Sequence, residues 1–337
     1  MYKYAIIGFG GLGKLHLCNL LKIANERKDF ELAALCGADP STFKDNVKLN
    51  LGDLDISNID FSGIHFYQDY KEMIEKEDLD FVLSTLPTHL HKEVAEFALN
   101  KGLHVLSEKP MALSIEDCDA MIDAAKRTGS KLMIGHCLRF NPAFLKLKEY
   151  VDNKTFGKAL RAEFSRYSQT PLWTWNNWIL DPEKSGGCPI DMHIHDTDLI
   201  NWMFGMPNSI RSVTTENKTK LESMFTQYFY DGLFVMANAD WSMTQTFPFE
   251  ARCIVIFEEA TVVILGENIT VYKDDESFVP YLLGESNMHY TEVEAFLKYA
   301  LDDIPCEITS PESIRNTVKL ALAEIESAKN GGKTITF

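Results

Sequence analysis

Short apolar runs alternate with longer amphipathic segments over residues 1–136. Runs such as KYAIIGF, DFVLSTL and LHVLSE have the length of buried strands, whereas HKEVAEFALNKG has apolar residues at helical spacing. Gly102 and Gly129 stand where two helical segments should end. Strands interleaved with helices predict parallel βαβ units, so we expect residues 1–136 to form a doubly wound Rossmann domain with a parallel sheet.

The pattern changes in the rest of the chain. Segments such as SIRSVTTEN and EARCIVIFEEATVVIL are strand-like and have turn signals with almost no helix between them. Two helical segments follow, YTEVEAFLKYALDD and SPESIRNTVKLALAEIESAKNGG, and the second has Ser310 as its N-cap and Pro311 in its first turn. We therefore predict that residues 137–337 form an α+β domain with a large, mainly antiparallel open sheet.

Composition and charge restrict the class of partner. The chain of 337 residues has 33 Lys and Arg against 49 Asp and Glu, a net charge of −16 that repels nucleic-acid phosphates. No apolar run approaches the ~20 residues that span a bilayer, and MYKYAIIGFGG enters a strand without signal-peptide features. The seven cysteines are scattered without any C-x-x-C pair, which suggests reduced core residues. We expect a cytoplasmic protein with neither a nucleic-acid nor a membrane partner.

The stretch AIIGFGGLGKLH carries three glycines in G-x-G-x-x-G spacing between a predicted strand and a predicted helix. This spacing supplies a tight turn, room for a pyrophosphate and close packing of the helix. The letters nearly fit the G-x-x-x-x-G-K loop of triphosphate-binding proteins, but Leu15 stands where a hydroxyl would hold magnesium. We therefore predict dinucleotide binding. The loop residues expected to contact the cofactor are Gly8, Phe9, Gly10, Gly11, Leu12 and Gly13.

The second predicted strand should end in an acid that binds the ribose hydroxyls. The stretch LAALCGADPS offers Gly37 and Ala38 near the expected end, with Asp39 slightly later. No Arg stands beside them to bind a 2′-phosphate, which favours NAD and leaves NADP open. In the alternative interpretation, Asp39 only begins the turn into Pro40.

Glu108 and Lys109 form a charged couple at the end of the apolar run in VLSEKPMALS. Ligands of open parallel sheets bind outside the carboxyl ends of the strands, so a Lys at this place can face a reacting group. Pro110 biases Lys109 toward extended backbone, which would hold its side chain there. The alternative is a turn with two solvated charges. For Glu108, a contact with the cofactor ribose and a surface ion pair both stay open.

Together with the glycine loop, the stretches STLPTHLH, EKP and GGCPIDMHIHDTDLINWMFG resemble the motifs of the Gfo/Idh/MocA oxidoreductase family, over most of the chain. The resemblance implies a nicotinamide cofactor and a polyhydroxylated substrate such as a sugar, a sugar acid or a cyclitol. It also implies Lys109 at the reacting carbon, with Asp191 and His195 beside it. The residues that it implies along the cofactor are Thr85, Leu86, Pro87 and His91.

The sequence departs from the common family pattern at two positions. Gly37 stands where an acid is frequent, which leaves the choice between NAD and NADP open. His193 stands where glycine or another small residue is common, which leaves the substrate open.

Oxidation of a secondary alcohol requires a base for the hydroxyl proton and a cation near the developing alkoxide. Lys109 can be that cation, and the imidazole of His195 is a base with an ordinary pKa of ~6.5. Four-residue spacing on a helix would bring Asp191 and His195 to one face, with Asp191 holding the substrate. His193 would then point away from that face. Asp191, His193 and His195 could be taken for metal ligands, but His193 does not share their face and no fourth ligand is evident, so we expect no metal.

Two further stretches offer binding residues. Arg139 in GHCLRFNP is a candidate to hold a cofactor or substrate oxygen, the alternative being a structural ion pair between domains. The stretch PLWTWNNWIL places Trp173, Trp175 and Trp178 in a predicted loop, where they could face a sugar or pack into the core. The residues expected to bind the substrate are Lys109, Arg139, Trp175, Trp178, Asp191 and His195.

The leading functional hypothesis is an NAD(P)-dependent dehydrogenase acting on CH–OH groups. A nicotinamide-dependent glycosidase that oxidises its substrate transiently and a non-catalytic NAD-binding sugar sensor are the alternatives. The joint presence of Lys109, Asp191 and His195 argues against the sensor. By analogy with similar proteins, the sheet of the second domain, which includes FTQYFYDGLFVMANADW, is expected to form a homodimer or homotetramer.

Overall fold

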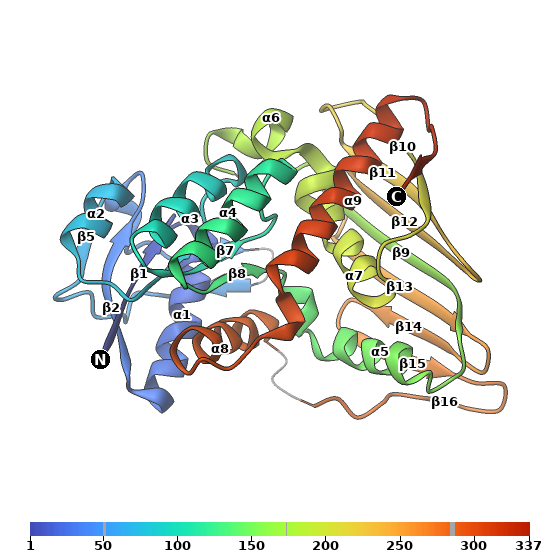
Figure 1. Cartoon of the computed structure of the whole chain (residues 1–337), viewed down its shortest axis with the longest axis horizontal. Helices are drawn as coiled ribbons and strands as arrows, with labels where there is room; N and C mark the ends of the chain where they lie inside the picture. Colours follow the sequence, from blue (N-terminus) through green and yellow to red (C-terminus); the bar gives the residue numbers. More distant parts are fainter. Residues whose placement is uncertain (50–51, 173, 284–286) are drawn as a thin grey trace. The chain divides into compact units, whose positions relative to one another are not determined.

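The computed structural model of the protein describes residues 1–49, 52–172, 174–283 and 287–337 (Figure 1). Its chain divides into two compact units, each with its own large sheet. The first unit comprises Met1–Ala112, Glu116–Gly135 and His289–Pro311. The second unit comprises Leu113–Ile115, His136–Met288 and Glu312–Phe337.

Besides Leu113–Ile115, the segment His289–Pro311 lies in a different unit from the domain expected from the sequence. It follows the second sheet along the chain, yet it belongs to the first unit. Its helix α8 (Met288–Leu301) packs Phe296 against Phe81, with ring centroids 5.8 Å apart. The helical pattern of this segment does not reveal which sheet it covers, so its assignment to residues 137–337 followed chain order alone.

The first unit contains a six-stranded parallel sheet with the strand order β5-β2-β1-β6-β7-β8. This is the Rossmann order, in which the chain reverses direction across the sheet after the first three strands. The strands are β1 (Tyr2–Ile7), β2 (Phe30–Cys36), β5 (His65–Tyr67), β6 (Phe81–Ser84), β7 (His104–Glu108) and β8 (Leu132–Gly135). A separate hairpin pairs β3 (Val47–Leu49) with β4 (Gly52–Leu54).

Helices surround this sheet (Figure 1). Besides α8 they are α1 (Gly11–Arg27), α2 (Tyr70–Lys76), α3 (His91–Asn100) and α4 (Ile115–Thr128). The strands β6 and β8 are buried at every position, as expected for parallel strands covered on both faces. The continuous apolar runs of the sequence therefore mark the central strands, and the predicted Rossmann fold is confirmed.

The second unit contains a nine-stranded sheet with the order β16-β15-β14-β13-β9-β12-β11-β10-β17. All neighbours are antiparallel except β9 and β12, so the predicted mainly antiparallel sheet is confirmed. The strands are β9 (Ala159–Gln169), β10 (Ser209–Val213), β11 (Ser223–Tyr230), β12 (Leu233–Met243), β13 (Glu250–Phe257), β14 (Thr261–Leu265), β15 (Asn268–Tyr272), β16 (Ser277–Phe278) and β17 (Ile335–Thr336).

In the described part of the chain, helices cover one face of this sheet (Figure 1). The longer helices of the unit are α5 (Pro142–Asn153), α7 (Ile194–Phe204) and α9 (Pro311–Lys329), and the short helix α6 spans Pro182–Ser185. The three long helices pack on alternate residues of β9, β12 and β13, which form one apolar core (Figure 1). The intervening residues of these strands form an open face.

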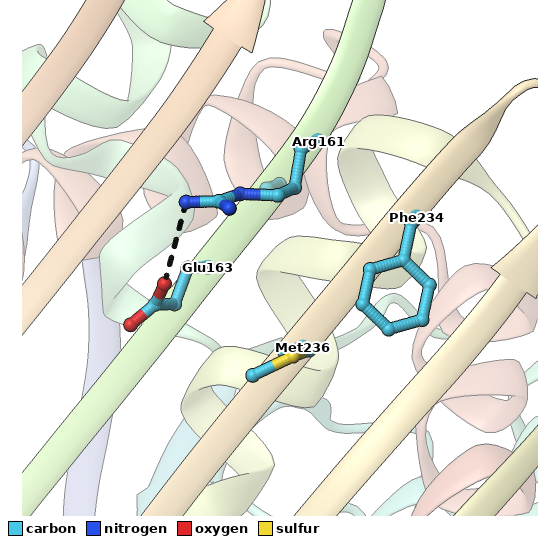
Figure 2. Close-up of a pocket in the computed structure, with 5 residues that line it drawn as sticks. Arg161, Glu163, Phe234 and Met236 are labelled. Atoms are coloured by element: carbon cyan, nitrogen blue, oxygen red, sulfur yellow. Dashed lines mark ion pairs between the residues drawn. The ribbon is translucent and has the colours of Figure 1, made fainter.

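The open face carries a hollow of about 190 Å³ between β9 and β12 (Figure 2). Arg161 pairs in register with Phe234, and Glu163 pairs with Met236. Figure 2 shows the Arg161 side chain directed toward Glu163, with the apolar side chains on the neighbouring strand. This arrangement places a half-buried apolar pair beside a charged pair.

Candidate active site

The glycine loop joins β1 to α1 in the first unit. Gly8 has a φ of 91°, and a Cβ atom there would lie 2.8 Å from the backbone of Thr85. A Cβ atom at Gly13 would lie 2.8 Å from the carbonyl oxygen of Gly8. A Cβ atom at Gly10, the N-cap of α1, would meet nothing within 4 Å. Gly8 and Gly13 are thus required by packing, whereas Gly10 leaves open space at a helix N-terminus, where an anionic group binds.

The remaining loop residues have different surroundings. Phe9 is 3% exposed, and its ring packs against Phe43 at 5.3 Å. Gly11 and Leu12 begin α1 and are half-buried. The backbone of this loop is therefore the part that can face a cofactor, because the one aromatic side chain points inward.

The Lys14 side chain passes the Phe9 ring, whose centroid lies 5.9 Å from its Nζ, and reaches the loop after β2. Its side chain is buried, and Nζ donates hydrogen bonds to the carbonyl oxygens of Thr42 at 2.7 Å and Asp45 at 2.6 Å. Desolvation by burial lowers the pKa of Lys14. The lysine thus ties α1 to the loop after β2, which agrees with the rejection of a triphosphate loop.

Asp39 lies in the loop after β2 and caps a short 3₁₀ turn. Its Oδ1 accepts hydrogen bonds from the backbone of Ser41 at 3.0 Å and from its hydroxyl at 2.6 Å, which lower the pKa of Asp39. The side chain is exposed. Gly37 explains why no acid stands earlier, since a Cβ atom there would lie 2.7 Å from the ring of Phe43.

The segment after β6 packs on the glycine loop. Thr85 Oγ1 donates a hydrogen bond of 2.6 Å to the carbonyl oxygen of Gly8. His91 is 1% exposed, with Nε2 2.8 Å from the carbonyl oxygen of Leu86 and Nδ1 2.7 Å from that of Pro110. Burial lowers the pKa of His91, against the effect of both carbonyl oxygens. His91 therefore braces the predicted cofactor loop from inside the protein, and Pro87 precedes a short turn, η2 (Thr88–Leu90).

The charged couple stands at the end of β7, as expected from the sequence. Glu108 is 8% exposed and its Oε1 lies 2.7 Å from His16 Nε2. Lys109 is half-buried, and its backbone N–H donates to Glu108 Oε2 at 3.3 Å. Burial raises the pKa of Glu108, but the hydrogen bond and charge of His16 outweigh this effect and lower it. Glu108 is thus neither a solvated turn residue nor part of a surface ion pair.

A second carboxyl group lies beside Glu108. Glu292 of α8 is 0% exposed, and burial together with the charge of Glu108 raises its pKa well above the ordinary value. A ring nitrogen of His16 and one carboxylate oxygen each of Glu108 and Glu292, which are atoms that can bind a metal ion, lie within 4.8 Å of one another. The 2.7 Å between His16 and Glu108 is a hydrogen-bond distance, shorter than the ~3.4 Å that separates ligands of a tetrahedral zinc ion.

Glu292 was not among the site residues predicted from the sequence, although its position carries a signal. It stands on the apolar face of α8, between the buried His289 and Phe296. An acid on such a face is unusual for an amphipathic helix. Burial lowers the pKa of His289 to about 4, and the neighbouring His16 contributes to this effect.

In the second unit, Asp191 belongs to a π-helix, η5 (Pro189–His193), which continues into α7. The sequence had suggested one regular helix. Asp191 and His195 are half-buried, whereas the residues between them are buried. The two predicted catalytic residues therefore share the more exposed side of the helix, and His193 points into the interior.

Arg139 braces the same helix. It is 0% exposed in a 3₁₀ turn, η3 (Cys137–Phe140), and donates two hydrogen bonds to Asp198 of α7, at 2.8 and 2.7 Å. Burial alone would raise the pKa of Asp198, but Arg139 and His136 hold it far below the ordinary value. This geometry favours the structural interpretation of Arg139, within one unit rather than between two domains.

The tryptophans of the predicted substrate loop have separate surroundings. Trp175 is 64% exposed at the start of η4 (Trp175–Leu180). Trp178 packs on a small apolar cluster that includes Met192 and Trp241. Trp173 lies outside the described residues. Trp175 is thus accessible to a ligand, whereas Trp178 contributes to the core.

Both halves of the chain match models of known protein families. A family model described as "Oxidoreductase family, NAD-binding Rossmann fold" matches residues 2–136, and one described as "GFO/IDH/MocA C-terminal domain" matches residues 144–263. A myo-inositol 2-dehydrogenase from Thermotoga maritima is 31% identical over 205 residues, which cover 60% of this chain and 55% of that protein. A 2,7-anhydro-N-acetylneuraminate hydratase from Mediterraneibacter gnavus is 32% identical over 143 residues, 42% of this chain and 38% of that protein.

The curated relatives match over about half of their own length. Solved structures match over nearly the whole chain. The WlbA dehydrogenase from Chromobacterium violaceum, solved with NADH and UDP-GlcNAcA, has a TM-score of 0.82 and 21% identity, covering 100% of this chain and 96% of that one. At this identity the structural match shows the shared fold.

Proposed function

Because the chain belongs to the Gfo/Idh/MocA oxidoreductase family, we propose that it is an NAD-dependent dehydrogenase acting on a secondary hydroxyl of a polyhydroxylated small molecule. A sugar, a sugar derivative or a cyclitol is the substrate class, in line with the relative named myo-inositol 2-dehydrogenase. The observation that carries the proposal is the open space at Gly10, at the N-terminus of a long helix in a Rossmann unit.

The residues of this chain fit a dinucleotide. Backbone N–H groups of the glycine loop would hold the pyrophosphate, and the segment Thr85–Pro87, which packs against that loop, would line the cofactor. The exposed carboxylate of Asp39 would repel a 2′-phosphate, which supports NAD over NADP. When bound, the nicotinamide supplies the hydride acceptor.

The proposed proton chemistry gives one role to each of the three predicted catalytic residues. We assign to His195 the removal of the substrate hydroxyl proton, since a neutral imidazole accepts a proton near neutral pH. Asp191, on the same side of its helix, would hold a substrate hydroxyl. Lys109 would donate a hydrogen bond to the developing alkoxide. Trp175 is exposed and can stack on a sugar face, whereas the buried Arg139 supports α7.

A net redox-neutral reaction is the second candidate. The similarity to a protein named a hydratase supports it, because that name describes addition or loss of water rather than net oxidation. Such an enzyme would convert its substrate without accumulating NADH. The glycosidase alternative belongs to the same redox-neutral class.

The test is turnover with a panel of sugars, sugar acids and cyclitols, followed by both NADH absorbance and product analysis. A dehydrogenase forms NADH in step with product. Product without NADH would establish the redox-neutral alternative, and binding of NAD without any product would support a sensor.

Lys109→Ala sharpens this test. We expect NAD affinity to stay within about tenfold while turnover falls by on the order of 10²–10⁴, the span of a positioned catalytic group. Lys109→Arg should rescue little, because a planar guanidinium does not replace a compact ammonium. Equal losses of NAD affinity and turnover would make Lys109 a cofactor ligand only.

A further inference from the structure

The interior of the second unit holds a polar group that the proposed reaction does not use. His193, Thr197, Tyr228 and Glu324 are each 0% exposed and come from η5, α7, β11 and α9. Glu324 accepts hydrogen bonds from the Tyr228 hydroxyl at 2.8 Å and from the Thr197 hydroxyl at 3.2 Å. His193 Nε2 lies 3.4 Å from Glu324 Oε2 and 3.3 Å from the Tyr228 hydroxyl. These contacts join four elements at one point.

The charges around Glu324 favour its protonated form. Burial raises the pKa of Glu324 to about 8. The hydrogen bonds from Tyr228 and Thr197 act against this rise, and the charge of Asp196 adds to it. Burial and Glu324 also raise the pKa of Tyr230, so that phenol stays neutral. At pH 7 Glu324 therefore mostly holds a proton.

His193 is neutral in the same surroundings. Burial lowers its pKa to about 4; the charge of Asp196 acts against this effect and that of Arg166 adds to it. The Tyr228 hydroxyl donates to Glu324 Oε1, and Glu324 Oε2 lies 3.4 Å from His193 Nε2, so a proton held on Oε2 faces that nitrogen. With Nε2 as the acceptor, His193 carries its own proton on Nδ1, a buried nitrogen that has no hydrogen-bond partner among the described residues.

The position of His193 links its contact with Glu324 to the two predicted catalytic residues of this helix. His193 stands between Asp191 and His195, and its side chain extends to α9. It also closes the π-helix that carries Asp191, and π-helical turns are frequent at functional sites. Whatever holds His193 thus fixes the backbone of both predicted catalytic residues.

We propose that Glu324 is a positioning residue that, in its protonated form, holds His193 and thereby fixes the π-helix bearing Asp191 and the start of α7 bearing His195. The positioning role rests on the proposed dehydrogenase function. Ionisation of Glu324 would place a charge in the interior beside Asp196, and His193 would have to move its proton to Nε2 to keep the contact, so the geometry of this anchor changes as pH rises through about 8.

The first test does not depend on activity. Nitrogen NMR of histidine-labelled protein should show His193, identified by its loss in His193→Gln, as a neutral Nδ1–H tautomer from pH 5 to 7 with a shift as pH passes about 8. In Glu324→Gln the shift near pH 8 should disappear. A His193 that titrates like an ordinary imidazole near ~6.5, or a shift that survives in Glu324→Gln, would overturn the proposal.

The second test uses turnover. Glu324→Gln keeps a donor toward His193, so turnover at pH 7 should stay within about threefold and its fall above pH 8 should vanish. Glu324→Leu should reduce kcat by about tenfold or more, with the affinity for NAD unchanged, because misplaced catalytic groups lower kcat. Glu326→Gln, an exposed position on the same helix, is the matched control and should behave as wild type.

The outcomes separate two kinds of failure. Absence of any turnover with intact NMR behaviour would remove the dehydrogenase function and leave the Glu324–His193 contact. Equal kcat in Glu324→Leu and Glu326→Gln would remove the positioning role even if the contact is real.

Discussion

Glu108 and Glu292 place two carboxyl groups in one buried region of the first unit, and their mutual repulsion disfavours ionisation of both. The hydrogen bond from His16 selects Glu108 as the charged partner, so Glu292 is the acid that keeps its proton. The protonated Glu292 therefore lies beside the charged couple formed by Glu108 and Lys109. The buried contacts of Glu108 with His16 and Glu292 fix the end of β7, which Lys109 follows.

Glu292→Gln should change how stability depends on pH. A group whose pKa is raised on folding contributes stability below its unfolded pKa, and this contribution is lost as pH rises toward the folded pKa. The free energy of unfolding of the wild type should thus fall relative to that of Glu292→Gln as pH rises above ~4.5. Urea unfolding of both proteins at pH 5, 6 and 7 measures the difference, in which the effect of Glu324 cancels.

Glu294→Gln is the control for that experiment. Glu294 lies on the same helix and forms a surface ion pair of 3.0 Å with Lys298. Its substitution should leave the pH dependence as in wild type. A constant difference between Glu292→Gln and wild type from pH 5 to 7 would show that Glu292 is already ionised.

His195→Ala should remove the acid limb of the pH–rate profile for alcohol oxidation, because protonation of the base no longer limits the reaction. His193→Ala removes a buried side chain, so it should lower stability and turnover while the acid limb remains. Initial rates from pH 5 to 9 compare the two variants. An acid limb retained in His195→Ala would mean that another residue takes the proton.

At the scale of elements, the glycine loop and α7 show what local sequence can predict. The roles of Gly8, Gly10 and Gly13 depend mainly on the strand before them and the helix after them, so the loop could be predicted from local sequence. The π-helix was not predictable, because the motif that carries Asp191 fits an α-helix equally well. In the fold, His193 at the end of this π-helix contacts Glu324 of α9 and Tyr228 of β11, which are distant in sequence.

Buried partners distant in sequence were also beyond prediction. Arg139 was considered for ligand binding because an Arg near a predicted site is commonly functional, but Asp198 neutralises it in the interior. Likewise, nothing in the pattern of α9 names His193 as the partner of Glu324. An acid on an apolar helix face signals a buried polar contact, yet only the fold supplies the other half.

Gly10→Val tests the loop as an element. The added side chain would enter the open space over the N-terminus of α1, and its Cβ meets no protein atom within 4 Å. We therefore expect the fold to be kept and NAD affinity to fall by at least about a hundredfold, since a branched group excludes the pyrophosphate. Calorimetric titration with NAD, with circular dichroism as the check of folding, measures both. Wild-type affinity would show that the cofactor does not bind over this loop.

At the scale of the whole molecule, the open face of the nine-stranded sheet is the surface we propose for homo-oligomer formation. On this face the half-buried Phe234 and Met236 lie beside Arg161 and Glu163, so a second copy could cover the apolar pair and meet the charged pair (Figure 2). A closed dimer with twofold symmetry uses the same surface patch on both copies. The open face around β9 and β12, near the middle of the nine-stranded sheet, is the patch that we propose for this role.

Met236→Arg is the variant that tests this surface. A second guanidinium next to Arg161 would add like charge to a buried interface, which is costly, whereas the isolated unit would tolerate an exposed arginine at this half-buried position. We expect light scattering after gel filtration to show a multimer for wild type and for the Glu326→Gln control, and a monomer for Met236→Arg. Circular dichroism should be unchanged, because the opposite face of β12 holds the core. A wild-type monomer, or a Met236→Arg protein that stays multimeric, would show that copies of the chain do not associate through this face.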